Sequence, residues 1–242
     1  DLGISKELIA FGKREESATN YLAERINGKM TIIEIGANIG YYVLLEAAKI
    51  ESGSQVYAFE PAPENFAILK ENVEINNLGN LVNTYQMAVS NYDGEAFLTL
   101  ENYANWHHID NYNTNTPLTG SKKITVPVVS LDSFCEQHKI DEVDFIRADI
   151  EGHEYAMIEG AKNILNKTTK CILFIELHTN LLYQLGKNPM DLLDIIESCG
   201  FRCSLITGHR NRVKKDVSWK FLKKYVDALL AYYGYHIVFE KG

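Results

Sequence analysis

The stretch from residue 31 to residue 42 constrains the fold more than any other part of the chain. A β-branched apolar run, residues 31–35, leads directly into a turn with two glycines, Gly36 and Gly40, and then into an apolar helical pattern. Glycine has no side chain and tolerates unusual backbone angles, so such a turn brings bare N–H groups against a ligand at a helix N-terminus. The pattern therefore predicts a strand, a ligand-binding turn and a helix at the start of an α/β domain.

The segments that follow keep the rhythm of an α/β sheet. Strands are expected at 55–59, 81–89, 144–148, 171–175, 201–206 and 235–239, with helices at 64–76, 131–139, 154–165 and 190–199. Strands that alternate with helices predict a parallel sheet with right-handed crossovers. We expect residues 1–30 to form an N-terminal helical lead-in and residues 31–242 to form one domain. That domain carries an insertion loop at about 101–123, flanked by short strands at 96–100 and 124–129, and a basic segment at about 209–224.

Composition narrows the class of protein. The 242 residues are 46% hydrophobic and 23% charged, as in an ordinary globular protein, and the net charge of −8 makes a nucleic-acid partner unlikely. No apolar run reaches the length of a membrane span. The four cysteines form no C-x-x-C pair, so we expect free thiols and a cytoplasmic location.

The residues of the turn separate two kinds of ligand. A dinucleotide site needs G-x-G-x-x-G, but Asn38 occupies the middle glycine position and Tyr41 the third. The carboxylate of Glu34, just before the turn, would repel a pyrophosphate and attract a cation. S-adenosylmethionine, which carries an ammonium and a sulfonium and no phosphate, fits this turn better than a dinucleotide.

Glu60 closes the second expected strand. A carboxylate at that position accepts hydrogen bonds from both ribose hydroxyls in dinucleotide folds, so Glu60 indicates an adenosine-bearing ligand of either class. An NAD-type Rossmann oxidoreductase and a cofactor-binding module without catalysis therefore remain as alternatives.

Four motifs in one order resemble a known family. They are E-I-G-A-N-I-G-Y-Y at 34–42, A-F-E-P followed by P-E-N at 58–65, A-V-S at 88–90 with Gly94, and I-R-A-D-I-E-G-H-E at 146–154. Together they resemble the FkbM-type family of S-adenosylmethionine-dependent methyltransferases. The resemblance implies an α/β class I methyltransferase fold, a doubly wound, mostly parallel seven-stranded sheet with an antiparallel last strand. It also implies O-methylation of a hydroxyl on a small molecule or glycan.

The resemblance implies a cofactor site as well. Gly36, Asn38 and Gly40 would border the methionine part of S-adenosyl-L-methionine, Glu60 would hold the ribose, and the region of Ala88 would flank the adenine. The full set of expected cofactor-binding residues is Glu34, Gly36, Ala37, Asn38, Gly40, Glu60, Pro61, Asn65 and Ala88.

Polar residues that follow the fourth and fifth sheet strands are the candidates for chemistry. Ligands bind beyond the carboxyl ends of parallel strands, so we expect Asp149, Glu151 and His178 to be catalytic. Asp149 is the first candidate for base or acceptor-orienting group, because a hydroxyl must lose its proton in methyl transfer. We assign no metal ligands, although the same three side chains could instead bind a divalent cation.

The acceptor site is expected at Trp106, His107 and His153, where an aromatic ring and hydrogen-bonding groups suit a sugar. Trp106 could equally anchor a surface loop. The acceptor partner would be a small molecule or glycan, and a homo-oligomer is possible. The basic residues of 202–224 are interpreted as a solvated helix face, with phosphate binding as the alternative.

Overall fold

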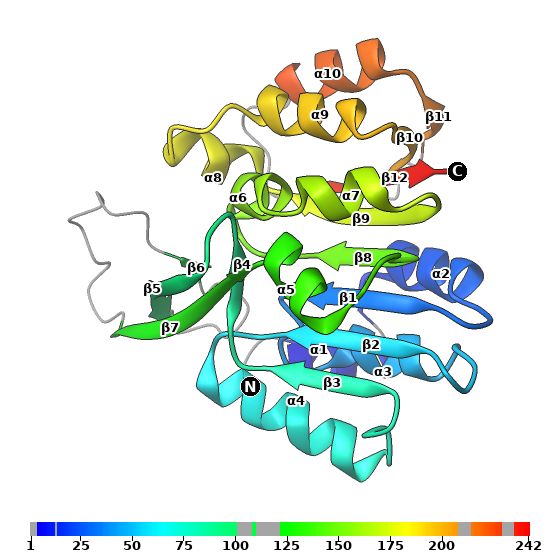
Figure 1. The fold of residues 1–242 in the computed structure, drawn as a ribbon, viewed down its shortest axis with the longest axis vertical. Coiled ribbons are helices and arrows are strands. Elements are labelled where there is room, and N and C mark those ends of the chain that lie inside the picture. Colours follow the sequence, from blue (N-terminus) through cyan, green and yellow to red (C-terminus); the bar gives the residue numbers. More distant parts are fainter. Residues whose placement is uncertain (1–3, 13, 101–107, 110–121, 208–213, 229–234) are drawn as a thin grey trace. The chain divides into compact units, whose positions relative to one another are not determined.

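The structure is a computed structural model that describes residues 4–12, 14–100, 108–109, 122–207, 214–228 and 235–242. The chain divides into two compact units. Figure 1 labels its helices and strands. The first unit holds residues 1–88 and 94–128, and the second holds residues 89–93 and 129–242.

Three parallel strands form the centre of the first unit. Its elements, in chain order, are α1 (Ile4–Phe11), α2 (Glu16–Arg25), β1 (Thr31–Ile35), α3 (Tyr41–Ala47), β2 (Gln55–Phe59), α4 (Pro63–Ile75) and β3 (Val82–Tyr85). β2 pairs in parallel with both β1 and β3. The apolar residues of β1 and β2 are almost fully buried, which is typical of a parallel sheet covered on both faces. The expected strand, turn and helix at 31–42 are confirmed.

A small antiparallel sheet follows. Its elements are β4 (Ala88–Ser90), β5 (Gly94–Leu100), β6 (His108–Ile109) and β7 (Lys122–Ser130), and β5 pairs with both β6 and β7. Alternate residues of β5 and β7 pack with Ala62 and Ala88 into one apolar cluster. The single strand expected at 81–89 is wrong, because the chain leaves β3 after Tyr85 and enters β4 at Ala88.

The second unit carries the remaining strands and helices. They are α5 (Leu131–His138), β8 (Phe145–Ala148), α6 (Glu154–Glu159), α7 (Lys162–Lys167), β9 (Cys171–Leu177), α8 (Thr179–Gln184), α9 (Pro189–Ser198), β10 (Arg202–Thr207), β11 (Lys214–Val217), α10 (Trp219–Ala228) and β12 (Tyr235–Lys241). The strand order is β11-β10-β12-β9-β8. β8 and β9 are parallel, whereas β12 is antiparallel to both of its neighbours, β9 and β10. The predicted antiparallel last strand is therefore confirmed, and β11, antiparallel to β10, is an addition that the sequence did not suggest.

One predicted helix is interrupted. The expected helix at 154–165 is divided into α6 and α7 at Gly160. A Cβ atom on Gly160 would lie 2.0 Å from the backbone oxygen of Ser90, so only glycine allows these two backbones to approach so closely. The carbonyl of Gly160 also accepts a hydrogen bond of 2.9 Å from the backbone N–H of Asp132.

The basic C-terminal segment has an apolar side. In α10 the side chains of Leu222 and Val226 are buried, and the indole of Trp219 donates to the carbonyl of Phe201 at 3.2 Å and stacks on Phe239. This side of α10 therefore packs against the protein interior. Among the described residues, no helix combines the length and apolar character needed to cross a membrane.

Candidate functional site

The turn at residues 36–40 uses left-handed backbone conformations. The φ angles are +78° at Gly36, +51° at Asn38 and +93° at Gly40. Asparagine tolerates this region better than most residues because its short side chain bonds locally. Here Asn38 Oδ1 accepts a hydrogen bond from the backbone N–H of Ile39 at 2.9 Å. The conformation thus accounts for the residue that breaks the dinucleotide pattern.

The side chain of Glu60 fastens this turn to the end of β2. One carboxylate oxygen accepts from the Asn38 N–H at 2.8 Å, and the other accepts from the Ala62 N–H at 2.9 Å. The carbonyl of Phe59 accepts from the N–H groups of Gly36 and Ala37, at 2.9 Å each. The sequence predicted a ligand contact for Glu60, and the structure shows that its side chain sets the shape of the turn.

The other residues expected at the cofactor differ in their burial. Gly36, Asn38 and Pro61 are half-buried, whereas Ala37, Asn65 and Ala88 are buried. Glu34 lies within β1 and is only 1% exposed. Sequence reasoning missed Asn72 of α4, whose side-chain amide donates to the carbonyl of Ile39 at 2.7 Å and braces the far end of the turn.

The second unit brings together the three residues expected to be catalytic. Asp149 follows β8, and its carboxylate accepts from the guanidinium of Arg147, which is 2% exposed, at 3.3 Å. His178 follows β9, and its Nε2 lies 3.4 Å from Glu151 Oε2. Glu151 adopts a φ of +45°, a strained conformation for a glutamate, which turns the chain after β8.

Glu154 is a member of this group that sequence reasoning treated only as the first residue of a helix. Its side chain is 0% exposed, and one oxygen accepts from His178 Nδ1 at 2.6 Å and from the Gly152 N–H at 3.0 Å. Because a carboxylate can only accept, Nδ1 carries the proton and Nε2 points toward Glu151 and Glu176.

Burial and the charges of neighbouring side chains shift the pKa values of this group. Burial raises the pKa of Glu151 to about 8; His178 opposes the shift, while Asp149, Glu176 and Glu154 add to it. Burial alone would lower the pKa of His178, but the hydrogen bond and charge of Glu154, with the charges of Glu151 and Glu176, hold it well above its ordinary value. The group can therefore hold and release protons close to neutral pH.

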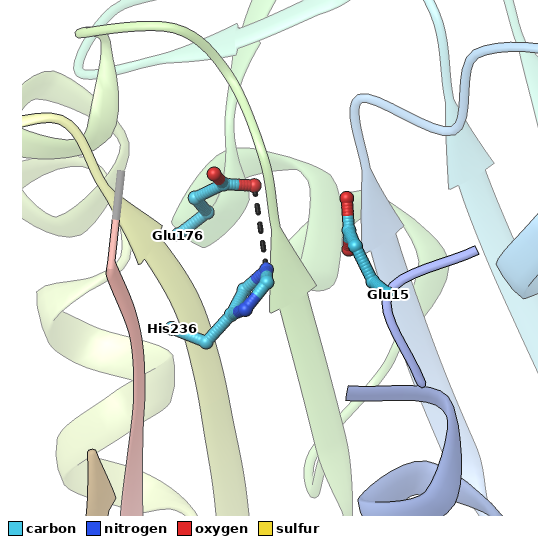
Figure 2. A group of neighbouring side chains, drawn as sticks. All are labelled: Glu15, Glu176 and His236. Atoms are coloured by element: carbon cyan, nitrogen blue, oxygen red, sulfur yellow. Dashed lines mark ion pairs between the residues drawn. The ribbon is translucent and has the colours of Figure 1, made fainter. Parts of the chain in front are cut away.

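Glu176 bridges two histidines. Its Oε1 lies 3.7 Å from His178 Nε2, and its Oε2 lies 3.4 Å from His236 Nε2, the pair marked by the dashed line in Figure 2. The imidazole of His236 stacks on Phe174 at 5.3 Å. The sequence gave no reason to single out His236, since it lies in an ordinary strand pattern and only the antiparallel pairing of β12 with β9 places it opposite Glu176.

The expected acceptor residues have different outcomes. His153 is buried, and its Nε2 is hydrogen-bonded to the hydroxyl of Ser90 at 2.9 Å. Burial lowers the pKa of His153 to about 4, so the imidazole is neutral. The structure thus places His153 in the protein interior rather than in the group around His178. Trp106 and His107 lie outside the described residues.

Residues 34–203, which include the turn and both strand ends, match the FkbM methyltransferase domain. The chain belongs to the FkbM methyltransferase family. The match includes every residue expected at the cofactor and all three expected to be catalytic, so both groups lie in the part of the chain that defines this family.

Three relatives illustrate what this family member is similar to. It is 23% identical over 183 residues, 75% of this chain and 67% of the relative, to hexuronic acid methyltransferase AglP of Haloferax volcanii. The crystal structure of methyltransferase FkbM from Methylobacillus flagellatus has a TM-score of 0.53 at 15% identity, over 87% of this chain but only 43% of that one. An O-methyltransferase from Bacillus cereus in complex with SAH (S-adenosylhomocysteine) has a TM-score of 0.52 at 15% identity, over 95% of this chain and 83% of that one. The class I methyltransferase fold predicted from the sequence is confirmed.

Proposed function

We propose that this FkbM family member is an S-adenosylmethionine-dependent O-methyltransferase that acts on a hydroxyl of a small molecule or glycan. The observation that carries the proposal is the 36–40 turn, held in a left-handed conformation by the carboxylate of Glu60. A related fold with bound SAH, in the Bacillus cereus enzyme, supports the choice of cofactor.

The turn has the chemistry that this cofactor requires. Backbone groups of Gly36 and Asn38 would face the methionine part, and no phosphate needs to be accommodated. The carboxylate of Glu34 favours a cationic ligand. Glu60 already accepts two backbone hydrogen bonds, but a carboxylate offers about four acceptor positions, so it can also receive ribose hydroxyls. Ala37, Gly40, Pro61, Asn65 and Ala88 complete the proposed cofactor site.

The chemistry of methyl transfer indicates what Asp149, Glu151 and His178 would do. The acceptor oxygen forms a bond to the methyl carbon as the carbon–sulfur bond breaks, S-adenosylhomocysteine leaves, and the hydroxyl proton must go to a base or to water. We assign Asp149, Glu151 and His178 to the acceptor hydroxyl and to that proton. Trp106 and His107 stay as predicted acceptor-binding residues.

The Haloferax volcanii relative is a hexuronic acid methyltransferase, which supports a carbohydrate acceptor. A glycoside that contains a hexuronic acid is therefore the first acceptor to test. We also propose that residues 31–242 form the methyltransferase domain, with residues 1–30 as its lead-in.

Calorimetric titration with S-adenosylmethionine, S-adenosylhomocysteine and NAD⁺ tests the cofactor. We expect both S-adenosyl ligands to bind and NAD⁺ to give no response; tight binding of NAD⁺ alone would overturn the proposal. A non-catalytic module would bind the cofactor but transfer no labelled methyl group to any acceptor in a panel of hydroxylated glycosides.

The catalytic assignment has its own test. The Asp149→Ala variant should bind S-adenosylhomocysteine like the wild type while methyl transfer to the acceptor collapses. Near-normal turnover in this variant would remove Asp149 from the catalytic residues.

A further inference from the structure

Three possible metal-ligand atoms converge beyond the ends of β8 and β9. One carboxylate oxygen each from Asp149 and Glu151 and one ring nitrogen of His178 lie within 4.8 Å of one another. Two ligands bound at about 2.1 Å from one ion are roughly 3.0 Å apart when adjacent and roughly 4.2 Å apart when opposite. The three atoms therefore need only a small contraction to share an ion.

The spacing of His178 and Glu151 fits two ligands better than a hydrogen bond. A hydrogen bond between a charged nitrogen and a carboxylate contracts to about 2.7–2.9 Å. The bond from His178 Nδ1 to Glu154 is of this short kind, at 2.6 Å. On the other side of the ring, Nε2 stays 3.4 Å from Glu151 Oε2, which lies within the separation expected for two ligands of one ion.

The environment of His178 is a second, separate indication. Histidines that bind metals usually donate their other ring N–H to a carboxylate, which fixes the tautomer and the ring orientation. Glu154 does this from a fully buried position. The second oxygen of Glu154 is buried and has no hydrogen-bond partner among the described residues, so the charge of this carboxylate is compensated mainly through His178.

The charges of the group favour a cation. Four carboxylates gather around His178, those of Asp149, Glu151, Glu154 and Glu176. The basic partners given by the same contacts are Arg147, on Asp149, and His236, on Glu176. Like charges held close together repel one another, and a divalent cation between these carboxylates would reduce that repulsion.

We propose that Asp149, Glu151 and His178 bind a divalent first-row transition-metal ion. Two carboxylate oxygens and one imidazole nitrogen suit Mn²⁺ or Zn²⁺ better than Mg²⁺, which prefers oxygen ligands and water. The binding of the ion is independent of the proposed function, but its role rests on that function. An acceptor hydroxyl bound to the ion would lose its proton to water more readily, and the resulting oxygen anion would attack the methyl carbon.

Titration of the chelator-treated protein with Mn²⁺, followed by electron paramagnetic resonance of the free ion, and with Zn²⁺, followed by calorimetry, tests the site. We expect one Mn²⁺ or Zn²⁺ per chain, and we expect Asp149→Asn and Glu151→Gln each to weaken binding by at least about tenfold. Glu136→Gln, which neutralises an exposed carboxylate of α5, is the control and should bind as the wild type does. Thermal unfolding of the metal-free variants verifies that each is folded.

The absence of saturable binding by the wild type at millimolar Mn²⁺ and Zn²⁺ would overturn the proposal. Binding that Asp149→Asn and Glu151→Gln leave unchanged would overturn it too, because the ion would then lie elsewhere. The Mn²⁺ and Zn²⁺ titrations are done without the cofactor. A failure to bind S-adenosylhomocysteine would therefore count against the proposed function but not against the metal site.

Discussion

Replacement of Glu60 by glutamine isolates the contribution of one carboxylate to the cofactor site. Glu60 accepts hydrogen bonds from the backbone N–H groups of Asn38 and Ala62, at 2.8 and 2.9 Å. Glutamine keeps one acceptor oxygen and brings an NH₂ group in place of the other. One of the two backbone N–H groups would then face a second donor inside a buried site.

The expected loss of stability in Glu60→Gln follows from these two hydrogen bonds. A hydrogen bond to a charged group contributes about 1.5–3 kcal/mol, so Glu60→Gln should lower the free energy of unfolding by about 2 kcal/mol. For a chain of this length the corresponding fall in melting temperature is roughly 4–8 °C. If Glu60 also accepts the ribose hydroxyls, the same magnitude applies to binding, and the affinity for S-adenosylhomocysteine should fall by roughly tenfold to a hundredfold.

Urea unfolding and calorimetric titration with S-adenosylhomocysteine measure the two effects separately. Glu64→Gln, at an exposed position in the first turn of α4, is the matched control and should change stability by no more than about 0.5 kcal/mol. A loss of stability with unchanged affinity would refute the ribose contact and leave Glu60 as a brace of the turn. An unchanged free energy of unfolding would show that the two hydrogen bonds to Glu60 do not stabilise the protein.

Two further outcomes follow from the second unit. Gly160→Ala would place a Cβ atom 2.0 Å from the backbone oxygen of Ser90, so the free energy of unfolding in urea should fall by about 3 kcal/mol. Gly79 has open space around it, so Gly79→Ala should leave the free energy of unfolding nearly unchanged. A small effect of Gly160→Ala would mean that the two backbones separate easily. The pKa of His153 is lowered to about 4 in the folded state, against about 6.5 when unfolded, so the unfolded state takes up the proton first. Neutral His153 therefore contributes its full stabilisation above pH 6.5. As the pH decreases to 4, the free energy of unfolding falls by about 3 kcal/mol. His153→Gln should remove this part of the acid sensitivity, and identical pH profiles for the two proteins would contradict the assignment.

The turn and most strands of the sheet could be predicted from short stretches of the sequence. Apolar residues at 55–59 bounded by Gly53 and Pro61 predicted β2 with its observed limits. The polar ends of the strands also predicted that Asp149, Glu151 and His178 would meet, because the carboxyl ends of neighbouring parallel strands lie at one edge of a sheet.

Features that depend on contacts between distant residues could not be predicted. The break between α6 and α7 exists because Ser90, far away in the sequence, approaches Gly160. An acidic residue at the start of a helix usually needs no other explanation, so Glu154 gave no signal of its bond to His178. His153 alternates with Glu151 in the sequence, but the left-handed backbone of Glu151 and Gly152 turns its side chain toward Ser90 instead.

Hydrogen exchange of the backbone amides with and without S-adenosylhomocysteine tests the central claim most directly, because it reports both binding and its location. The account predicts slower exchange on ligand addition at residues 36–42 and around Glu60, with little change in α9 and α10. No protection in the 36–40 turn at a saturating ligand concentration, or protection confined to other segments, would contradict it.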